Sequence, residues 1–437
     1  MTGLVFLAAF AALPIVGAGP ILSRRLSWLP FGFAVTSAAS VGAVILGAEM
    51  FVSTLVGLRW TLGLLLAAPA IAIAVALRRR GTSPSQTGPL PPSRMTPAAF
   101  GMLGIAAAAV AVVAYAAMTA RITSSDLLLF WGAKGEQFGL AGRIDYDFLG
   151  RADHLLMHAD YPPLWPCLYA FATMAAGRFA WGASLATLPF FLALGTVSMW
   201  SIGRRRLGAL EAAGLAAAFA AMFGFLLLEG LTAGNADAPL LFFEALTLCL
   251  LVFAREEPGV FLLAGIALAG AAWLKLEGIA FGWAVIAAAA VTIRPFSARK
   301  LAPLALPPLV AYGAWMIFCR THDLLDTLGK HTWVLTGERF RSIALGMVRA
   351  ASMESSYLPW VLVALLFAVR RPGRAAVFAV LVAALIAAFD GGFYLAAGSD
   401  PAVWIAMAGM RTLMTPLLAL LLAAMAPGGA TASAERR

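Results

Sequence analysis

Charged residues are scarce in this chain. Asp, Glu, Lys and Arg make up 12% of its 437 residues, about half of the roughly 25% that soluble domains carry. Apolar residues make up 62%, and the mean hydropathy is +0.89. A soluble fold could not hide so much apolar surface, because much of any folded surface contacts water. The composition therefore excludes a soluble enzyme and a disordered protein, and it predicts a polytopic membrane protein.

Cysteine and histidine are scarce as well. The three cysteines, Cys167, Cys249 and Cys319, are far apart and lie in or beside apolar runs. They form neither a metal-ligand spacing nor a disulfide framework, which excludes a secreted disulfide scaffold. The four histidines form no His-Glu-x-x-His pattern, and the chain has no Gly-x-Ser-x-Gly elbow. These absences argue against a protease.

The basic residues, which give a formal charge of +10, do not form the single stripe that binds nucleic acid. They stand in short clusters between apolar runs, as the positive-inside rule describes for cytoplasmic loops. The clusters are Arg24–Arg25, Arg78–Arg80, Arg204–Arg206, Arg294 with Arg299 and Lys300, and Arg370 and Arg371 with Arg374. We therefore expect a chain that begins outside, ends in the cytoplasm and binds no nucleic acid.

The apolar runs predict an all-α polytopic membrane protein with about 13 transmembrane helices, since about 20 apolar residues span a bilayer. The predicted spans are 4–22, 29–51, 58–77, 98–118, 183–202, 209–229, 238–254, 259–274, 279–293, 301–318, 356–370, 373–389 and 411–426. A cytoplasmic linker at 81–97, rich in Gly, Pro and Ser, separates three N-terminal helices (1–80) from a core (98–426). A cytoplasmic tail follows at 427–437.

Two segments do not fit the alternation of spans. Pro162–Gly177, at 1.5 Å per residue, reaches only about 24 Å and is shorter than the roughly 30 Å hydrocarbon core. We expect an interfacial or re-entrant helix there, begun by Pro162 and Pro163. Arg341–Met353 is expected to lie at the membrane interface as well.

The acidic residues, which were not used to assign the sides, gather on the predicted outer side. Of the 21 Asp and Glu residues, those on the inner side are Glu211, Glu256, Glu257 and Glu435. Short inner loops could simply lack room for acids. The functional interpretation is an active site at the outer membrane–water interface.

The longest outer loop contains Asp126, which directly follows Ser124 and Ser125. All three are good helix N-caps, and Asp126, Phe130 and Lys134 recur at the spacing of one helical face. We expect a short amphipathic helix on the membrane surface. Its expected anchors are Leu127, Leu128 and Trp131. Asp126 then either caps this helix or carries catalysis.

Two further acidic motifs stand directly before apolar helices. The prolines that follow His158-Ala159-Asp160-Tyr161 would start a helix and hold Asp160 and Tyr161 over the membrane. The same sequence also fits a plain turn. Asp237 precedes another span and is expected to cap it. Glu244 follows two turns deeper, where a carboxylate is expensive and usually paired or functional.

Two basic residues lie near other helix ends. Lys275, close to Glu277, interrupts the apolar stretch 259–293. A tight hairpin needs polar residues, but Lys275 could also bind a phosphate as a compact charge. Arg411 stands where the last span is expected to begin, and it suits either an anionic lipid headgroup or a plain interfacial anchor.

In this order the motifs resemble the C-type superfamily of membrane glycosyltransferases, which includes protein O-mannosyltransferases and the lipid A aminoarabinose transferase. The resemblance covers roughly residues 98–426. Its features are Asp126 with Phe130–Lys134, Asp160–Leu164, Asp237, Lys275 near Glu277–Gly278, and Arg411. Two features depart from the family: three spans precede the core, and Ser125-Asp126 stands where paired acidic residues are common.

The resemblance implies a C-type glycosyltransferase fold and an inverting transfer from a polyprenyl-phosphate-linked sugar to a lipid, glycan or protein acceptor. It implies Asp126 as catalytic base and a donor phosphate bound by Lys275, Arg411 and Lys134. Further candidate site residues are Asp160, Tyr161, Asp237, Glu277 and His158. Metal use varies in the superfamily, so a divalent cation is neither required nor excluded. The expected location is a bacterial inner membrane, with the active site outside.

A transporter or lipid flippase is the main alternative, and a polytopic scaffold is another. Transporters place ionisable residues near the bilayer midplane. The sequence suggests spans that are nearly free of charge at that depth, with the charges gathered at one surface. This pattern favours the transferase.

Overall fold

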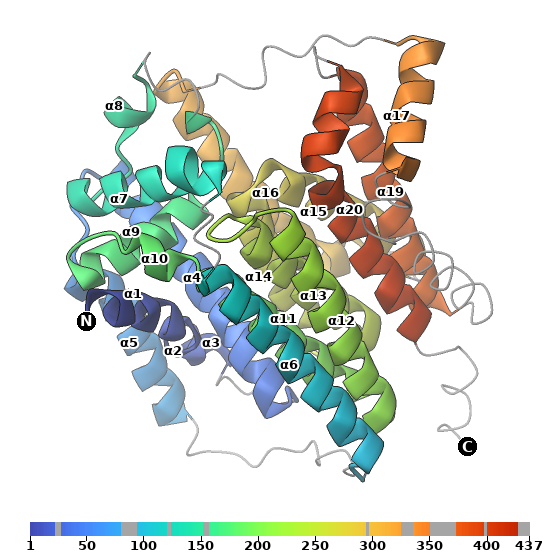
Figure 1. Ribbon diagram of the computed structural model, residues 1–437. Coiled ribbons are helices and arrows are strands. Elements are labelled where there is room, and N and C mark those ends of the chain that lie inside the picture. The colour runs from blue at the N-terminus through green and yellow to red at the C-terminus, as the bar shows by residue number, and fades with distance from the viewer. Residues whose placement is uncertain are drawn as a thin grey trace.

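The computed structural model describes residues 1–21, 28–79, 94–119, 124–151, 157–293, 297–324, 335–349, 373–396 and 400–426. All regular secondary structure in these ranges is helical (Figure 1). Seven helices among the described residues are long and apolar enough to cross a membrane. They are Thr2–Ile21, Phe31–Leu55, Pro97–Thr119, Trp181–Gly203, Ala209–Glu229, Ala298–Thr321 and Arg374–Ala396. An all-helical integral membrane protein is thus confirmed.

Five more predicted spans coincide with helices. These helices are α5 (Leu62–Arg79), α13 (Asp237–Phe253), α14 (Val260–Leu274), α15 (Leu276–Thr292) and α20 (Pro401–Met425). The predicted span at 356–370 lies outside the described residues. The count of about 13 spans therefore stays a prediction.

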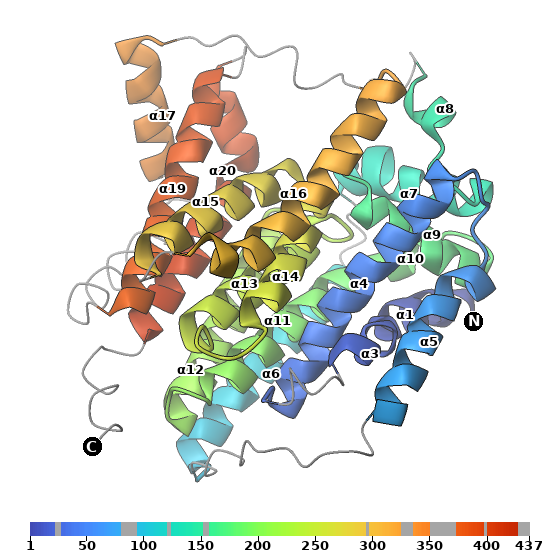
Figure 2. The same cartoon turned by 180° about the vertical axis from the view of Figure 1, so that it is seen from behind.

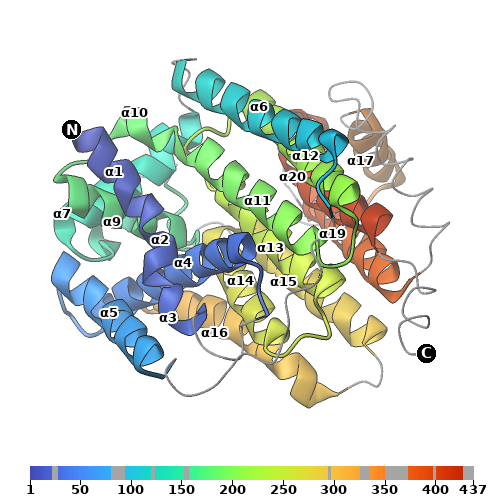
Figure 3. The same cartoon turned by 90° about the horizontal axis from the view of Figure 1, so that it is seen from below.

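The fully buried helix α13 lies at the centre of the molecule, and all of its residues are buried. It packs against α11 (Thr187–Gly203) and α14 on one side and against α20 on another. Helices α19 (Arg374–Ala396) and α20 pair beside this bundle, and α6 (Pro97–Thr119) lies along the outside of α12 (Ala209–Glu229) (Figures 1 and 3). The central position of α13 brings its first residue, Asp237, within reach of several helices.

Two short helices match the segments that were not expected to span. Helix α9 (Leu164–Ala176) follows Pro163, and at about 20 Å it is too short to cross the bilayer. It packs against α7 (Gly132–Ala141), α1 (Thr2–Ala11) and α4 (Phe31–Leu55), so most of its residues are buried in protein.

Helix α17 (Gly337–Arg349) occupies most of the second segment, and 350–353 lies outside the described residues. It stands beside α19 and α20 (Figures 1 and 2). Arg339 donates to the carbonyl oxygen of Tyr394 on α19, with Nη2 at 3.0 Å. These contacts do not show where α17 lies relative to the membrane, so its expected position at the interface stays a prediction.

The basic cluster Arg204–Arg206 contacts two other segments that were predicted to lie on the inner side. Arg205 bonds to the carbonyl oxygen of Trp28 and to the carboxylate of Glu257. Arg206 Nε donates to the Phe253 carbonyl at 3.2 Å, at the C-terminal end of α13. Since α13 has 17 residues, this end lies about 25 Å from Asp237. The basic end and the predicted site are therefore at opposite ends of the central helix.

The sidedness can be tested with single cysteines after the three buried native cysteines are replaced. Glu338 and Glu256 are both exposed and are predicted to lie outside and inside, respectively. A cysteine at Glu338 should react with an impermeant thiol reagent in intact cells. One at Glu256 should react only after permeabilisation. The reverse pattern would overturn the predicted orientation.

Candidate active site

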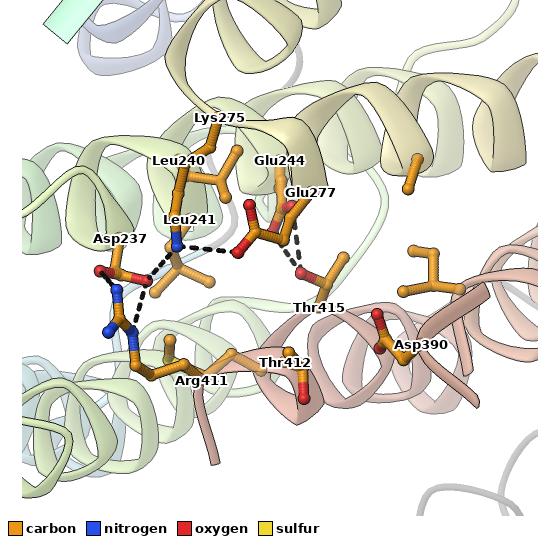
Figure 4. A pocket seen from close by; sticks show the side chains of 13 residues that line it. Asp237, Leu240, Leu241, Glu244, Lys275, Glu277, Asp390, Arg411, Thr412 and Thr415 are labelled. Carbon is orange, nitrogen blue, oxygen red and sulfur yellow. Dashed lines mark hydrogen bonds and ion pairs between the residues drawn. The ribbon is translucent and has the colours of Figure 1, made fainter. Parts of the chain in front are cut away.

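Four segments that are distant in the sequence bring charged side chains together at the N-terminal end of α13. Asp126 comes directly before the π-helix η3 (Leu127–Trp131), and Asp237 is the first residue of α13. Lys275 connects α14 to α15, and Arg411 lies on α20. Figure 4 shows Arg411 and Lys275 converging on the carboxylate of Asp237. All four were predicted from the sequence as site residues.

Arg411 holds two carboxylates with one guanidinium. Its Nε donates to Asp237 Oδ1 at 3.1 Å and its Nη2 to Asp237 Oδ2 at 2.8 Å, the bidentate arrangement that arginine favours. Its Nη1 donates to Asp126 Oδ2 at 3.0 Å. Arg411 therefore lies between the candidate base and a buried partner acid.

The helix that contains the predicted span 411–426 begins before Arg411, and the start of the span itself stays a prediction. Helix α20 begins at Pro401, where the Asp400 side chain accepts a hydrogen bond from the backbone N–H of Ala402 at 2.9 Å. Arg411 thus projects from the interior of a helix. A cation at such a position is costly in a membrane protein unless it is paired, and here its partners are Asp126 and Asp237.

Lys275 is held by the connection between α14 and α15. It has an extended backbone (φ −154°, ψ 159°) between the two helices, and Nζ lies 3.1 Å from Asp237 Oδ1 and 2.9 Å from Glu277 Oε1. Gly278 allows this close turn, since a Cβ there would lie 1.9 Å from the carbonyl oxygen of Ala271. Glu277, also predicted, therefore joins the same cluster.

Asp126 and Asp237 differ in exposure, and neither is a helix cap. The side chain of Asp126 is 36% exposed and that of Asp237 is 3% exposed. Neither carboxylate makes a capping hydrogen bond, so the capping expectation was wrong for both. Before η3 it is Ser124 Oγ that accepts from the backbone N–H of Asp126, at 3.1 Å. The Asp126 carboxylate is left free for Arg411.

Asn235 is a site residue that the sequence reasoning did not select. Its Nδ2 lies 2.9 Å from Ser124 Oγ and 3.4 Å from Asp126 Oδ2. It follows Gly234, whose positive φ of 82° suits glycine and whose carbonyl accepts from Tyr169 OH at 2.6 Å. The sequence signal that could have identified Asn235 is that it is a polar residue close to Asp237, in a loop between two predicted spans.

The expected amphipathic surface helix is a partly buried π-helical turn that continues into α7. Leu127 and Trp131 are buried in the protein core, so their predicted role as membrane anchors was wrong, while Leu128 is exposed as expected. A Cβ on Gly234 would lie 2.6 Å from Leu127 Cδ2, which shows how closely the two loops pack. Packing against the Gly234 loop therefore fixes the position of Asp126.

Lys134 belongs to a second cluster beside the first. It is 1% exposed, its Nζ donates to the carbonyl oxygen of His158 at 2.8 Å, and it lies 4.2 Å from the centre of the Phe130 ring. Burial lowers its pKa from the ordinary 10.5 to about 7, although the charge of Asp160 opposes the change. Its predicted contact with a donor phosphate stays a prediction.

Tyr161 lies between the two clusters. Its ring packs edge-on against Phe130 at 5.2 Å and Trp131 at 6.0 Å between centroids. Burial raises the pKa of Tyr161 and the charge of Glu277 raises it further, while Arg411 opposes them. The loop is fixed by Trp315, whose Nε1 donates to the carbonyl of Asp160 at 2.8 Å. The structure thus places His158, Asp160 and Tyr161 next to the Asp126 cluster.

A narrow cavity of about 20 Å³ extends from the ion pairs into the helix bundle. Its polar lining includes Glu244, whose carboxylate accepts from Thr415 Oγ1 at 3.0 and 2.9 Å, and Asp390 on α19. Both acids are buried and lie within the helices α13 and α19, while the depth of the charges in the membrane stays a prediction. Sequence reasoning missed Asp390, although it is the only Asp, Glu, Lys or Arg in the apolar run 375–396, itself a functional signal.

Within the described parts of the chain, no three His, Cys, Asp or Glu side chains are grouped so that they could hold a metal ion. Comparison with protein-family models, curated proteins and solved structures finds no match for the chain.

The buried Lys134 should give the protein a characteristic pH dependence of stability. Because its pKa is about 7 in the folded state and 10.5 ordinarily, the unfolded state binds more protons between these values. The free energy of unfolding of the wild-type protein should then rise with pH in this window. The free energy of unfolding of Lys134→Met should rise less steeply with pH. Measuring the free energy of unfolding in detergent from pH 7 to pH 10 gives the slope for each protein. Lys300→Met, at an exposed site, is the control, and equal slopes for Lys134→Met and wild type would contradict the burial argument.

Proposed function

We propose that this protein is an inverting glycosyltransferase of the C-type superfamily, which moves a sugar from a polyprenyl-phosphate-linked donor to an acceptor at the outer membrane face. One observation carries the proposal: the partly exposed carboxylate of Asp126 forms an ion pair with Arg411, and the buried Asp237 joins Arg411 to Lys275. A base that an acceptor can reach thus stands beside positive charges that suit a leaving phosphate.

The chemistry assigned to these residues is a single displacement. Asp126 takes the proton of an acceptor hydroxyl, whose oxygen attacks the anomeric carbon. The bond from that carbon to the phosphate oxygen breaks, and the phosphate leaves with the electron pair. Base catalysis of this kind contributes roughly 10²–10⁴-fold, and Arg411 and Lys275 stabilise the departing charge. Attack opposite the leaving group inverts the anomeric centre.

The ion pairs suggest how donor binding prepares the base. Arg411 Nη1 occupies Asp126 in the structure, while Nε and Nη2 remain on Asp237. A donor phosphate that takes over Nη1 would release the Asp126 carboxylate for the acceptor. Asp237 would keep the guanidinium in place during this exchange. We thus assign Asp237 a positioning role.

A lipid-linked donor also fits the proposed location in a bacterial inner membrane. Nucleotide sugars are cytoplasmic, so a transferase at the outer face needs a donor that is delivered through the membrane. A polyprenyl phosphate carries its sugar at headgroup depth, near the outer ends of about 13 spans. The acceptor is a lipid, a glycan or a protein that reaches the same interface.

The direct experiment incubates the purified protein with a panel of polyprenyl-phosphate sugars and follows the release of free polyprenyl phosphate. Slow hydrolysis of one donor, or its transfer to an added acceptor, is the expected result. Cleavage of that donor should depend on Asp126. No cleavage of any donor, with the protein folded, would count against a transferase.

A transporter or lipid flippase is the second candidate, and the buried acids Glu244 and Asp390 favour it. Ionisable residues inside spans often belong to transport pathways. Reconstituted vesicles distinguish the two functions: a flippase would move a fluorescent polyprenyl-phosphate sugar between leaflets with its sugar–phosphate bond intact. A transferase would break that bond.

A further inference from the structure

The carboxylate of Asp126 has one occupied oxygen and one free oxygen. Its Oδ2 accepts from Arg411 Nη1 at 3.0 Å and from Asn235 Nδ2 at 3.4 Å. No hydrogen bond from the described parts of the chain reaches Oδ1. A base takes the proton on an oxygen that the acceptor can approach, so Oδ1 is the reacting oxygen in the proposed function. Oδ2 is the atom by which the carboxylate is held.

Donor binding removes one of the two contacts to Oδ2. In the proposed function a donor phosphate takes over Arg411 Nη1, the group that now binds this oxygen. The Asp126 side chain is 36% exposed, so without another contact it would be free to change rotamer. Among the described residues, Asn235 is the one remaining side chain that donates a hydrogen bond to the carboxylate.

The amide of Asn235 is itself held by a tightly bonded loop. Asn235 is 1% exposed, and its backbone N–H donates to the carbonyl of the fully buried Thr232 at 2.9 Å. The carbonyl of Gly234 accepts from Trp165 Nε1 at 3.1 Å and from Tyr169 OH at 2.6 Å. A side chain on such a loop is already ordered before a substrate arrives, so it can hold a carboxylate at little further entropic cost.

The same loop also holds the cation. Two residues after Asn235, the carboxylate of Asp237 binds Nε and Nη2 of Arg411 (Figure 4). Asn235 and Asp237 therefore hold the two partners Asp126 and Arg411 from neighbouring positions. When Nη1 turns to a phosphate, the ion pair between Asp126 and Arg411 opens, but each partner keeps its contact with the loop. The loop then sets the distance between the base and the cation.

The Asn235 amide also carries a cost that calls for an explanation. Its Oδ1 is buried and has no hydrogen-bond partner in the part of the chain that the structure describes, and a buried acceptor without a donor is destabilising. The neighbours of the amide fix this orientation. The Asp126 carboxylate accepts only, and Ser124 Oγ already accepts from the backbone N–H of Asp126. The N–H side of the amide therefore faces Asp126, and the oxygen is left without a donor.

We propose that Asn235 is a positioning residue for the proposed base. Its amide N–H keeps hold of Asp126 Oδ2 when a donor phosphate has taken Arg411 Nη1, so that Oδ1 stays directed at the acceptor hydroxyl. The inference rests on the proposed function. It gives Asn235 no contact with the donor phosphate, so loss of the amide lowers turnover and leaves donor binding nearly unchanged.

Asn235→Leu is the first test, because leucine has nearly the shape of asparagine but no N–H. Turnover should fall about tenfold or more, the size of a hydrogen bond to a charged group, while direct donor binding stays near that of the wild-type protein. The control is Thr232→Val, which removes a buried hydrogen bond of the same loop, from Thr232 Oγ1 to the Leu227 carbonyl at 2.7 Å. Its turnover should stay near wild type. Equal falls in the two variants would assign the effect to loop packing and contradict the proposal.

A double-mutant cycle then tests whether Asn235 acts through Asp126. In the Asp126→Asn background the base is absent, so Asn235→Leu should lower the residual turnover by less than about twofold. A structural effect would lower turnover by the same factor in both backgrounds, and that result would overturn the positioning role. If Asn235→Leu does not fold, Asn235→Asp enters the same cycle. It keeps the size of the side chain and replaces the N–H donor with an oxygen, so turnover should again fall only where Asp126 is present.

Cleavage by the wild-type protein separates the two hypotheses. If a lipid-linked donor is cleaved and the cycle shows no coupling between Asn235 and Asp126, the transferase stands and the positioning role fails. If the wild-type protein cleaves no donor, the transferase fails, and the positioning role fails with it because there is no base to hold.

Discussion

Asp126→Asn should reduce turnover of the lipid-linked donor by roughly two orders of magnitude or more, with the protein still folded. An amide cannot take the proton of the acceptor, but its oxygen can still accept hydrogen bonds from Arg411 and Asn235, as the carboxylate does. Donor affinity should fall little, because Arg411 and Lys275 are unchanged. The measurement is donor cleavage with acceptor at saturation, beside direct donor binding.

Asp145→Asn is the matched control for this experiment. Asp145 lies in the same predicted outer loop, and its side chain does cap a helix, accepting from the backbone N–H of Phe148 at 3.1 Å. Since Asn caps about as well as Asp, this variant should be nearly silent. If the turnover of Asp126→Asn equalled that of Asp145→Asn, Asp126 would be no more than an ion-pair partner of Arg411.

Asp237→Asn should be the most destabilising conservative change in the site, by about 3–5 kcal/mol, because it leaves two largely buried cations without their shared counter-charge. The side chain is 3% exposed and contacts both Lys275 and Arg411. Thermal unfolding in detergent should show a large fall in the midpoint. Adding Lys275→Met to Asp237→Asn should recover part of the loss, because it removes one of the two cations that lost Asp237 as a counter-charge.

The control for this second experiment is Asp147→Asn. Asp147 forms an ion pair with Arg143 at 3.4 Å, but its side chain is 72% exposed. Exposed pairs of this kind contribute about 0–1 kcal/mol, so the midpoint of thermal unfolding of Asp147→Asn should stay near that of the wild-type protein. Equal effects of the two substitutions would mean that Asp237 is better solvated than its burial indicates.

The sequence could identify the charged residues of the site but not their pairing. Asp126, Asp237, Lys275 and Arg411 stand out because charge is rare and each lies near an apolar run. Their contacts join residues 174 and 285 positions apart, and no local pattern records such distances. The capping expectation failed for a related reason: propensity treats a helix in isolation, while the cation on α20 offers Asp126 and Asp237 a stronger partner.

The interior of the bundle was harder to predict. Asp390 was overlooked as a single acid in a long apolar helix, and its relation to Glu244 depends on how α19 packs against the bundle. The span was predicted to begin at Arg411, whereas helix α20, which carries it, already begins at Pro401. Ion pairing with two acids allows the helix to carry that charge in its interior.

The π-helical turn at Leu127–Trp131 also decides how the site responds to a change in chain length. A π-turn contains about one residue more than an α-turn, so it behaves as an insertion that a helix has absorbed. Deleting a single residue such as Leu128 would let the segment wind as an ordinary α-helix, and Asp126 and Lys134 would keep nearly the same relative directions. The same deletion in an ordinary α-helix would rotate everything before it by about 100°. The turn is therefore the place in this segment where the candidate site can lose a residue and keep its register.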